Sequence, residues 1–213
     1  DSTLNLNLNG HKITREYITV IIVYGNLNVY DLTVNVDDGD ITTYNNDNKL
    51  QGTISGIIGI ENEGGIVKVF GGKIEGGNSG SINISKGGEV YLSGSPTIKS
   101  SKQGKDIVLE SHNEKLYAND GEETPTYYTG SALALHFEKY TSESVAVYGV
   151  NDANKDKFTL FDTNYYLEKK EDTNNLYLMG KPHNVTRYDE NGTELTDEKY
   201  PEILRYGDTV TIP

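Results

Sequence analysis

The chain has 213 residues, of which 35% are hydrophobic, and its formal net charge at pH 7 is −13. An acidic surface repels phosphate backbones and anionic membranes, so this charge argues against nucleic-acid binding. The sequence has no apolar run long enough to insert into a membrane, and its lack of cysteine rules out a disulfide framework and a thiolate zinc site.

A short pattern recurs through the first 126 residues: apolar, polar, apolar, a turn residue, then another apolar residue. Its copies start at Leu6, Leu27, Val67 and Val90, and a further strand follows at Leu116. A unit this short cannot bury its own apolar face and needs neighbours stacked on it. The repeat therefore predicts an all-β solenoid, a parallel β-helix in which each coil covers the previous one.

Spacing within the copies supports this prediction. The second strand residue and the apolar residue after the corner are 5 apart in three copies: Leu8 and Ile13, Val29 and Val34, Val69 and Ile74. The longer interval between Leu27 and Val67 requires an insertion, for which the polar segment 37–51 is suited. A second strand is expected at Ile58/Ile60, Ile82/Ile84 and Ile107/Leu109, with sharp corners at Gly64-Gly65 and Gly87-Gly88.

The glycine corners become rare over residues 127–183, although strand patterns continue. They occur at Leu133/Leu135/Phe137, Val145/Val147, Phe158/Leu160, Tyr166-Leu167 and Leu176/Leu178, with a hairpin loop at 172–175. An open solenoid end exposes unpaired strand edges, so we expect this region to hold the final coils and a β-rich cap. Residues 184–213 form a third region, a β-hairpin tail or the start of a further surface repeat.

Two stretches carry family resemblances. LNLNGHKIT, IENEGGIVKVFGGKIEG and INISKGGEVYLSGSPTIKS resemble the right-handed parallel β-helix (pectin-lyase-like) modules of Firmicutes surface proteins, over roughly residues 4–110. The tail, with its Asn191-Gly192 turn and Tyr206-Gly207-Asp208, resembles the opening half of a Listeria–Bacteroides-type repeat. The resemblance implies a secreted module, attached to a Gram-positive cell wall or surface through regions outside this sequence. The absence of cysteine agrees with such a source.

Side chains alternate along a strand, so the overlay also predicts which residues point to solvent. The outward columns are expected to hold Asn7, Asn28, Lys68, Tyr91 and Tyr117, then Asn9, Tyr30, Phe70 and Ser93, and on the preceding strand Gly59, Asn83 and Val108. Polysaccharide lyases and glycoside hydrolases on this fold need carboxylates and a cation on neighbouring coils. These columns contain no Asp or Glu, so no catalytic residue is assigned.

The aromatic residues Tyr30, Phe70, Tyr91 and Tyr117 are expected to project from one face on successive coils and are the candidate binding residues. A row of rings can stack on sugars or on an apolar patch of a partner protein. The alternative is an aromatic ladder that only stabilises the stacking of coils, and covered ladders of this kind are the more common arrangement.

No cofactor or metal is assigned. Asp37, Asp38 and Asp40 offer oxygen ligands for calcium but lack EF-hand spacing, and a solvated acidic turn is the simpler interpretation. The four histidines lack metal-ligand spacing: His11, His112, His136 and His183. The sequence thus favours a non-catalytic spacer or adhesin-like module that binds a glycan or a surface protein. The alternative is a carbohydrate-active enzyme domain whose acids come from residues 37–47 or from the cap.

Overall fold

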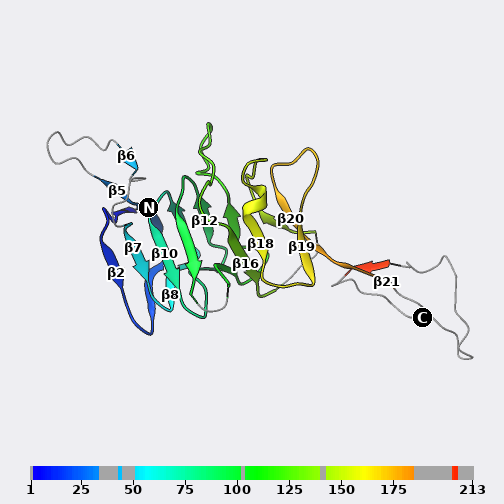
Figure 1. Cartoon of the computed structure of the whole chain (residues 1–213), viewed down its shortest axis with the longest axis horizontal. Coiled ribbons are helices and arrows are strands. Elements are labelled where there is room, and N and C mark those ends of the chain that lie inside the picture. The colour runs from blue at the N-terminus through cyan, green and yellow to red at the C-terminus, as the bar shows by residue number, and fades with distance from the viewer. Residues whose placement is uncertain are drawn as a thin grey trace, which may run out of the picture.

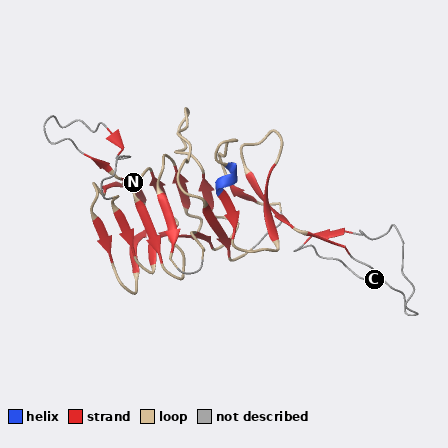
Figure 2. Cartoon of the chain, in the orientation of Figure 1, coloured by secondary structure: helices blue, strands red, loops and turns tan. Residues whose placement is uncertain are grey.

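The computed structural model describes residues 2–33, 43–44, 51–101, 104–139, 143–184 and 203–205. Over these residues the fold is all-β, with one short 3-10 turn, η1 (Lys155–Lys157), as the only helical element (Figures 1 and 2). The strands stand side by side along the long axis of the molecule, and their colour in Figure 1 runs from blue at one end to yellow at the other.

Most strands belong to three parallel sheets. Sheet A contains β1 (Thr3–Asn7), β4 (Asn26–Tyr30), β9 (Ile66–Val69), β12 (Glu89–Leu92) and β15 (Lys115–Tyr117). Sheet B contains β2 (Lys12–Thr14), β7 (Thr53–Ser55), β10 (Lys73–Gly76) and β13 (Thr97–Ser100). Sheet C contains β3 (Thr19–Val23), β8 (Ile58–Glu63), β11 (Ile82–Ser85), β14 (Ile107–Leu109), β16 (Leu133–Phe137) and β18 (Phe158–Leu160).

The chain visits the three sheets in a fixed order. Strands β9, β10 and β11 lie in sheets A, B and C, and β12, β13 and β14 repeat that order. Each of the first four passages therefore adds one parallel strand to every sheet, whereas β15 extends only sheet A and β16 and β18 extend only sheet C. The alternating apolar residues of successive passages meet inside. Leu27, Val67, Val90 and Leu116 are aligned in one buried file of sheet A, as the overlay predicted.

The first copy is shifted by two residues from the overlay. Leu4, not Leu6, is aligned with Leu27, and Leu6 is aligned with Val29. Leucine occupies positions 4, 6 and 8, and a period of two fits any register that keeps these leucines on the inner face. Leu8 lies instead at the corner after β1, where its N–H donates to Tyr30 O at 2.8 Å.

The predicted corner residue Val34 lies outside the described residues, and another residue takes its expected place in sheet B. Sheet B aligns Ile13, Ile54, Ile74 and Ile98, so Ile54 takes the place assigned to Val34. The chain leaves the repeat after β5 (Leu32–Thr33), which pairs with β6 (Thr43–Tyr44), and the strand of sheet B starts only at Thr53. The equal offset of 5 residues therefore does not hold in the first two copies.

In sheet C, β8 is shifted by two residues from the expected register. Ile82 and Ile107 are aligned as expected, but Ile60 and not Ile58 lies beside Ile82, so the residue beside Ile84 is Asn62 and not Ile60. Asn62 is fully buried, and its side chain accepts from Gly65 N and donates to the carbonyls of Gly65 and Glu89. This amide thus closes the corner between β8 and β9.

The predicted glycine corners are present. Gly64 and Gly87 have φ values of 82° and 76°, in the left-handed region that other residues rarely adopt. Their neighbours Gly65 and Gly88 are needed for space: a Cβ at Gly65 would lie 2.2 Å from Gly25 O, and one at Gly88 would lie 2.8 Å from Asn62 Nδ2.

The segments after residue 127 complete the fold. β16 and β18 extend sheet C, and an antiparallel sheet of β17 (Val145–Val147), β20 (Leu176–Gly180) and β19 (Tyr165–Lys169) follows at the far end (Figure 1). Val147, Leu176 and Leu178 are buried in the same core as the parallel sheets. All the strands expected here are observed, and β19 and β20 pair antiparallel on either side of the expected loop.

Within the tail, β21 (Pro182–Asn184) pairs antiparallel with β22 (Ile203–Arg205). The Asn191-Gly192 turn and Tyr206-Gly207-Asp208 lie outside the described residues. The interpretation of the tail as a hairpin or an incomplete repeat, and the domain boundaries at residues 126 and 183, stay predictions.

Candidate binding face

The four predicted binding residues all lie on the outer side of sheet A. Tyr30 ends β4, Phe70 follows β9, and Tyr91 and Tyr117 belong to β12 and β15. Each side chain is half-buried. The parallel pairing of these strands brings together residues that are up to 87 positions apart in sequence, roughly one per coil.

The rings form two stacks, because they belong to the two neighbouring outward columns of the overlay and not to one column. Tyr30 and Phe70 stack with centroids 4.7 Å apart, and Tyr91 and Tyr117 stack at 4.2 Å. The register explains the division, because Tyr91 is aligned with Lys68 and not with Phe70. Tyr148 extends the second stack, with its ring centroid 5.1 Å from that of Tyr117.

Lys68 lies between the two stacks. Its Nζ is 5.3 Å from the centroid of the Tyr91 ring and 3.0 Å from Glu122 Oε1, and it also donates to Asp120 O. The ammonium therefore occupies the ring face of Tyr91 that points toward Phe70 and ties the loop 119–126 to sheet A.

That loop covers the second stack. A Cβ at Gly121 would lie 2.6 Å from Tyr91 Cε1, so the backbone of Gly121 packs directly on this ring. The Asp120 carboxylate accepts from Glu122 N and Thr126 N and holds the loop closed. Tyr91 is thus packed under the loop and Tyr117 stacks on Tyr91, whereas Tyr30 and Phe70 line a hollow beside the loop.

A shallow hollow of about 330 Å³ lies on the open side. Its walls combine rings, amides, an ammonium and a carboxylate: Thr3, Asn26, Asn28, Tyr30, Ile66, Lys68, Phe70 and Glu122. Asn28 Nδ2 donates to Asn5 Oδ1 at 2.8 Å, which fixes its amide plane and leaves its oxygen as an acceptor. We name this set of residues the sheet A hollow.

A carboxylate that the overlay omitted from the outward columns lies next to the second stack. Glu89 accepts from Lys115 Nζ and from the Tyr91 hydroxyl, both at 2.8 Å. Burial alone would raise the pKa of Glu89, but these two donors outweigh it and hold the pKa below 4.5. The pKa of Tyr91 is raised, first by burial and then by its hydrogen bond to Glu89.

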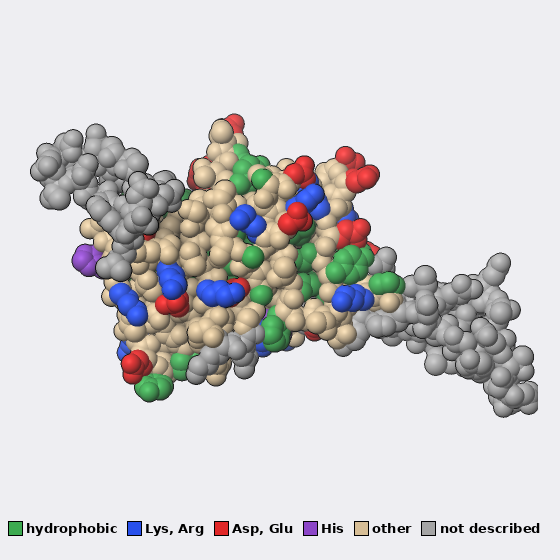
Figure 3. All heavy atoms as spheres, viewed as in Figure 1, with side chains coloured by type: hydrophobic (Ala, Val, Ile, Leu, Met, Phe, Trp, Pro, Cys, Tyr) green, Lys and Arg blue, Asp and Glu red, His purple; other side chains and the backbone are tan. Residues whose placement is uncertain are grey.

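The outward column predicted for sheet C also needs correction. The residue aligned with Asn83 and Val108 is Glu61, where the overlay placed Gly59. Glu61 Oε2 accepts from the Thr19 hydroxyl at 3.0 Å. Glu61 belongs to sheet C and Glu89 to sheet A, so these two acids do not share a sheet. Figure 3 shows acidic and basic side chains interspersed on the face that it presents.

The remaining sequence candidates contribute no assembled site. Within the described ranges, no three His, Cys, Asp or Glu side chains gather closely enough to hold a metal ion. His11 is exposed, whereas His136 lies on β16 edge-on to Phe161, and burial lowers its pKa. Asp37, Asp38 and Asp40 lie outside the described residues.

Sequence reasoning missed Glu122, Glu89, Tyr148 and the loop over Tyr91. Of these features, only Glu89 could have been found from the sequence. It directly precedes the inward-facing Val90, so the alternation of side chains along the strand points Glu89 to solvent.

Comparison with known proteins gives no match: no family model, no curated relative and no solved structure is similar to this chain. A search of the described residues for helices found none with the length and apolarity to span a membrane.

Proposed function

We propose that this chain is a right-handed parallel β-helix, a solenoid module of an extracellular bacterial surface protein, which binds a glycan without catalysis. The ordered passage through sheets A, B and C supports the architecture, because each passage repeats the same three strands. The observation that carries the binding proposal is the sheet A hollow, where aromatic edges and polar groups converge on one open surface.

The hollow suits a sugar better than a purely apolar partner. Hydroxyl groups of a sugar are both donors and acceptors, and they match the amides of Asn26 and Asn28 and the Lys68–Glu122 pair. The C–H faces of the same ring pack on Tyr30 and Phe70. Because Lys68 and Glu122 balance each other, and because the chain carries a net charge of −13, a neutral glycan is favoured over a polyanion.

The second aromatic stack serves stability in this proposal. Tyr91 and Tyr117 lie face to face with parallel planes, and Lys68 and Tyr148 approach their outer faces. Rings stacked in this way offer only their edges to solvent.

The proposed architecture also suits a spacer. Stacked coils with an interdigitated core resist bending, and a stiff module holds the hollow away from the cell.

A glycan array tests the binding proposal. The native chain should bind one or more neutral glycans, and Phe70→Leu, which keeps apolar bulk but removes the ring, should lower the affinity about tenfold or more, the loss expected for one sugar–aromatic contact. Tyr117→Phe is the matched control, because it keeps the covered ring and should bind like the native chain. Native chain that binds no glycan, or Phe70→Leu with unchanged affinity, would refute the proposal.

The absence of catalysis is tested separately. Each glycan that binds, together with a panel of polysaccharides, is incubated with the chain and its reducing ends or unsaturated products are measured. Turnover that disappears in Glu122→Gln or Glu89→Gln, or in Asp38→Ala of the insertion, would establish the enzymatic alternative instead.

A further inference from the structure

A groove crosses the corners that join sheet B to sheet C. The corner between β7 and β8 consists only of Gly56 and Ile57, whereas the corners on either side of it span residues 15–18 and 77–81. Ile57 N donates at 3.2 Å to a carbonyl of residues 15–18, and Ile57 O accepts at 2.8 Å from an N–H of residues 77–81. The short corner therefore lies directly between two longer ones and forms the floor of a hollow of about 700 Å³.

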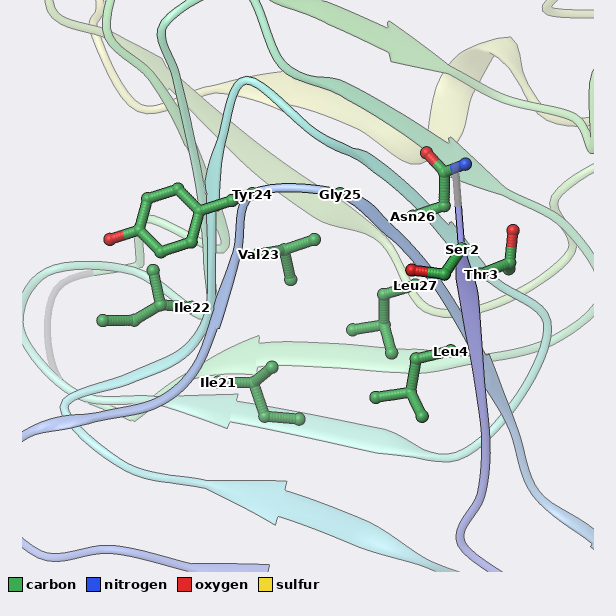
Figure 4. A pocket seen from close by; sticks show the side chains of 10 residues that line it. All are labelled: Ser2, Thr3, Leu4, Ile21, Ile22, Val23, Tyr24, Gly25, Asn26 and Leu27. Carbon is green, nitrogen blue, oxygen red and sulfur yellow. The ribbon is translucent and has the colours of Figure 1, made fainter.

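The lining of this hollow is mainly polar. It consists of residues 14–17, 55–57, 77–79 and Ser101, and we name it the corner groove. The hollow in Figure 4 is different, because aliphatic side chains from β1, β3 and β4 point into it. The corner groove lies between corners of this chain and not at the end of the stack, so its existence does not depend on what precedes residue 2.

Arg15 and Glu16 place opposite charges on one wall of the corner groove. Both side chains are exposed, and no ion pair among the described residues includes either of them. On the neighbouring face of sheet B, by contrast, Lys73 and Glu75 pair with each other. A ligand with one acidic and one basic group would complement both charges of the wall.

Tyr17 projects from the same wall in a strained conformation. Its side chain is 82% exposed, and its φ of 68° lies in the left-handed region that bulky residues rarely adopt. The residue thus gains little packing in return for its backbone strain. Strain of this kind clusters at functional sites, and an exposed tyrosine ring offers a large contact area to a ligand.

We propose that the corner groove binds a peptide segment that carries one acidic and one basic side chain. The Arg15 guanidinium donates two hydrogen bonds to the acid, and the Glu16 carboxylate accepts from the base. Tyr17 and Ile57 contact the apolar parts of the segment, and the exposed amide of Asn78 exchanges hydrogen bonds with peptide groups. A neutral or acidic glycan fits less well, because it brings no cation for Glu16.

An immobilised library of random hexapeptides is the probe for this site. Peptides that bind the native chain should share an acidic and a basic position. The double variant Arg15→Glu/Glu16→Arg reverses the two charges and keeps the net charge of −13. It should weaken each peptide about tenfold or more, because like charges then meet. Exchanging the acid and the base within a peptide should restore its affinity for the double variant.

The double variant Lys73→Glu/Glu75→Lys is the matched control. It reverses an ion pair on sheet B that does not line the groove, so the affinity for the selected peptides should stay unchanged. Tyr17→Gly separates binding from stability. It should lower the affinity about fivefold or more through loss of the ring, while the melting temperature stays equal or rises, because glycine adopts the left-handed conformation without strain.

Fluorescence polarisation of labelled peptides measures these affinities, and circular dichroism confirms that each variant is folded. The inference is overturned if no selected peptide carries both charges, if the reversal at Arg15 and Glu16 leaves the affinity unchanged, or if the control reversal weakens binding equally. Glycan binding that this reversal abolishes would assign the groove to a glycan and would also overturn it. The corner groove shares no residue with the sheet A hollow, and Phe70→Leu should leave peptide binding intact, so either proposal can fail alone.

Discussion

Buried carboxylates in this chain act at the corners between strands. Asp31 accepts from Gly10 N and Gly52 N, both at 2.8 Å, so one side chain holds two coils together. Asp106 accepts from Ser100 N and Ala134 N in the same manner. A sharp corner leaves backbone N–H groups without a ladder partner, and a charged acceptor satisfies them better than a neutral one. These two buried carboxylates thus serve the fold.

Glu114 gives a test of this role through pH. It is buried and accepts from Gly87 N, Ser111 N and the Ser111 hydroxyl. Burial raises its pKa, but these donors outweigh burial and hold the pKa below 4.5. A depressed folded-state pKa means that the stabilisation is complete above pH 4.5 and is lost as the pH falls through the folded-state pKa.

Glu114→Gln should therefore lower the free energy of unfolding by about 1–2 kcal/mol at pH 7, because the amide offers one acceptor and turns an NH₂ toward donors. The difference from the native chain should shrink as the pH falls below 4.5 and through the folded-state pKa, where the native carboxyl also becomes neutral. Urea unfolding at a series of pH values measures both effects, with exposed Glu123→Gln as the control. A pH-independent difference would contradict this account.

Aligned apolar residues hold neighbouring strands of this fold together. The corners must therefore let neighbouring strands lie at their usual spacing of about 4.7–4.9 Å. The glycine pairs after β8 and β11 meet this requirement in two ways. Gly64 and Gly87 supply the left-handed turn, whereas Gly65 and Gly88 leave room for the neighbouring coil. The two requirements can be separated by substitution.

Gly65→Ala and Gly87→Ala are a matched pair for that purpose. The alanine methyl at position 65 would lie 2.2 Å from Gly25 O, so the coils must separate, and we expect a loss of about 3 kcal/mol. At position 87 nothing lies within 4 Å of the added carbon, so only the left-handed conformation is strained and the loss should be about 1 kcal/mol. Chemical denaturation measures both losses, and the reverse order would show that backbone strain outweighs close packing.

The whole chain carries a formal net charge of −13 at pH 7. Like charges repel more strongly in the folded chain than in the expanded unfolded one, and salt screens this repulsion. Salt also weakens ion pairs such as Lys68–Glu122 and Lys115–Glu89. The sign of the change in stability with salt therefore shows whether charge repulsion or ion pairing dominates.

With a net charge of −13, we expect repulsion to dominate. Raising NaCl from about 20 to about 300 mM, which shortens the screening length several-fold, should raise the melting temperature by a few degrees. A lower melting temperature at high salt would mean that the ion pairs contribute more than the net charge.

Much of the fold was predictable because it repeats. Alternation places Val67, Val90 and Leu116 in one file, and glycine pairs mark corners that few other residues can form. The candidate site was less predictable. Lys68 and Glu122 are 54 residues apart, and the position at which the loop 119–126 lies on sheet A follows no period. The hollow beside Phe70 therefore had no signal in the sequence beyond the rings themselves.

The sequence alone determined that short strands alternate apolar and polar residues and turn at glycines, since both properties are local. Only the tertiary structure decided which residues lie side by side, because a two-residue slip of the first strand leaves the same leucine pattern inward. That slip separates Asn7 from Asn28 and aligns Leu4 with Leu27. Contacts between distant strands and the loop 119–126, and not the local pattern, placed Lys68 and Glu122 at the hollow on which the proposed function depends.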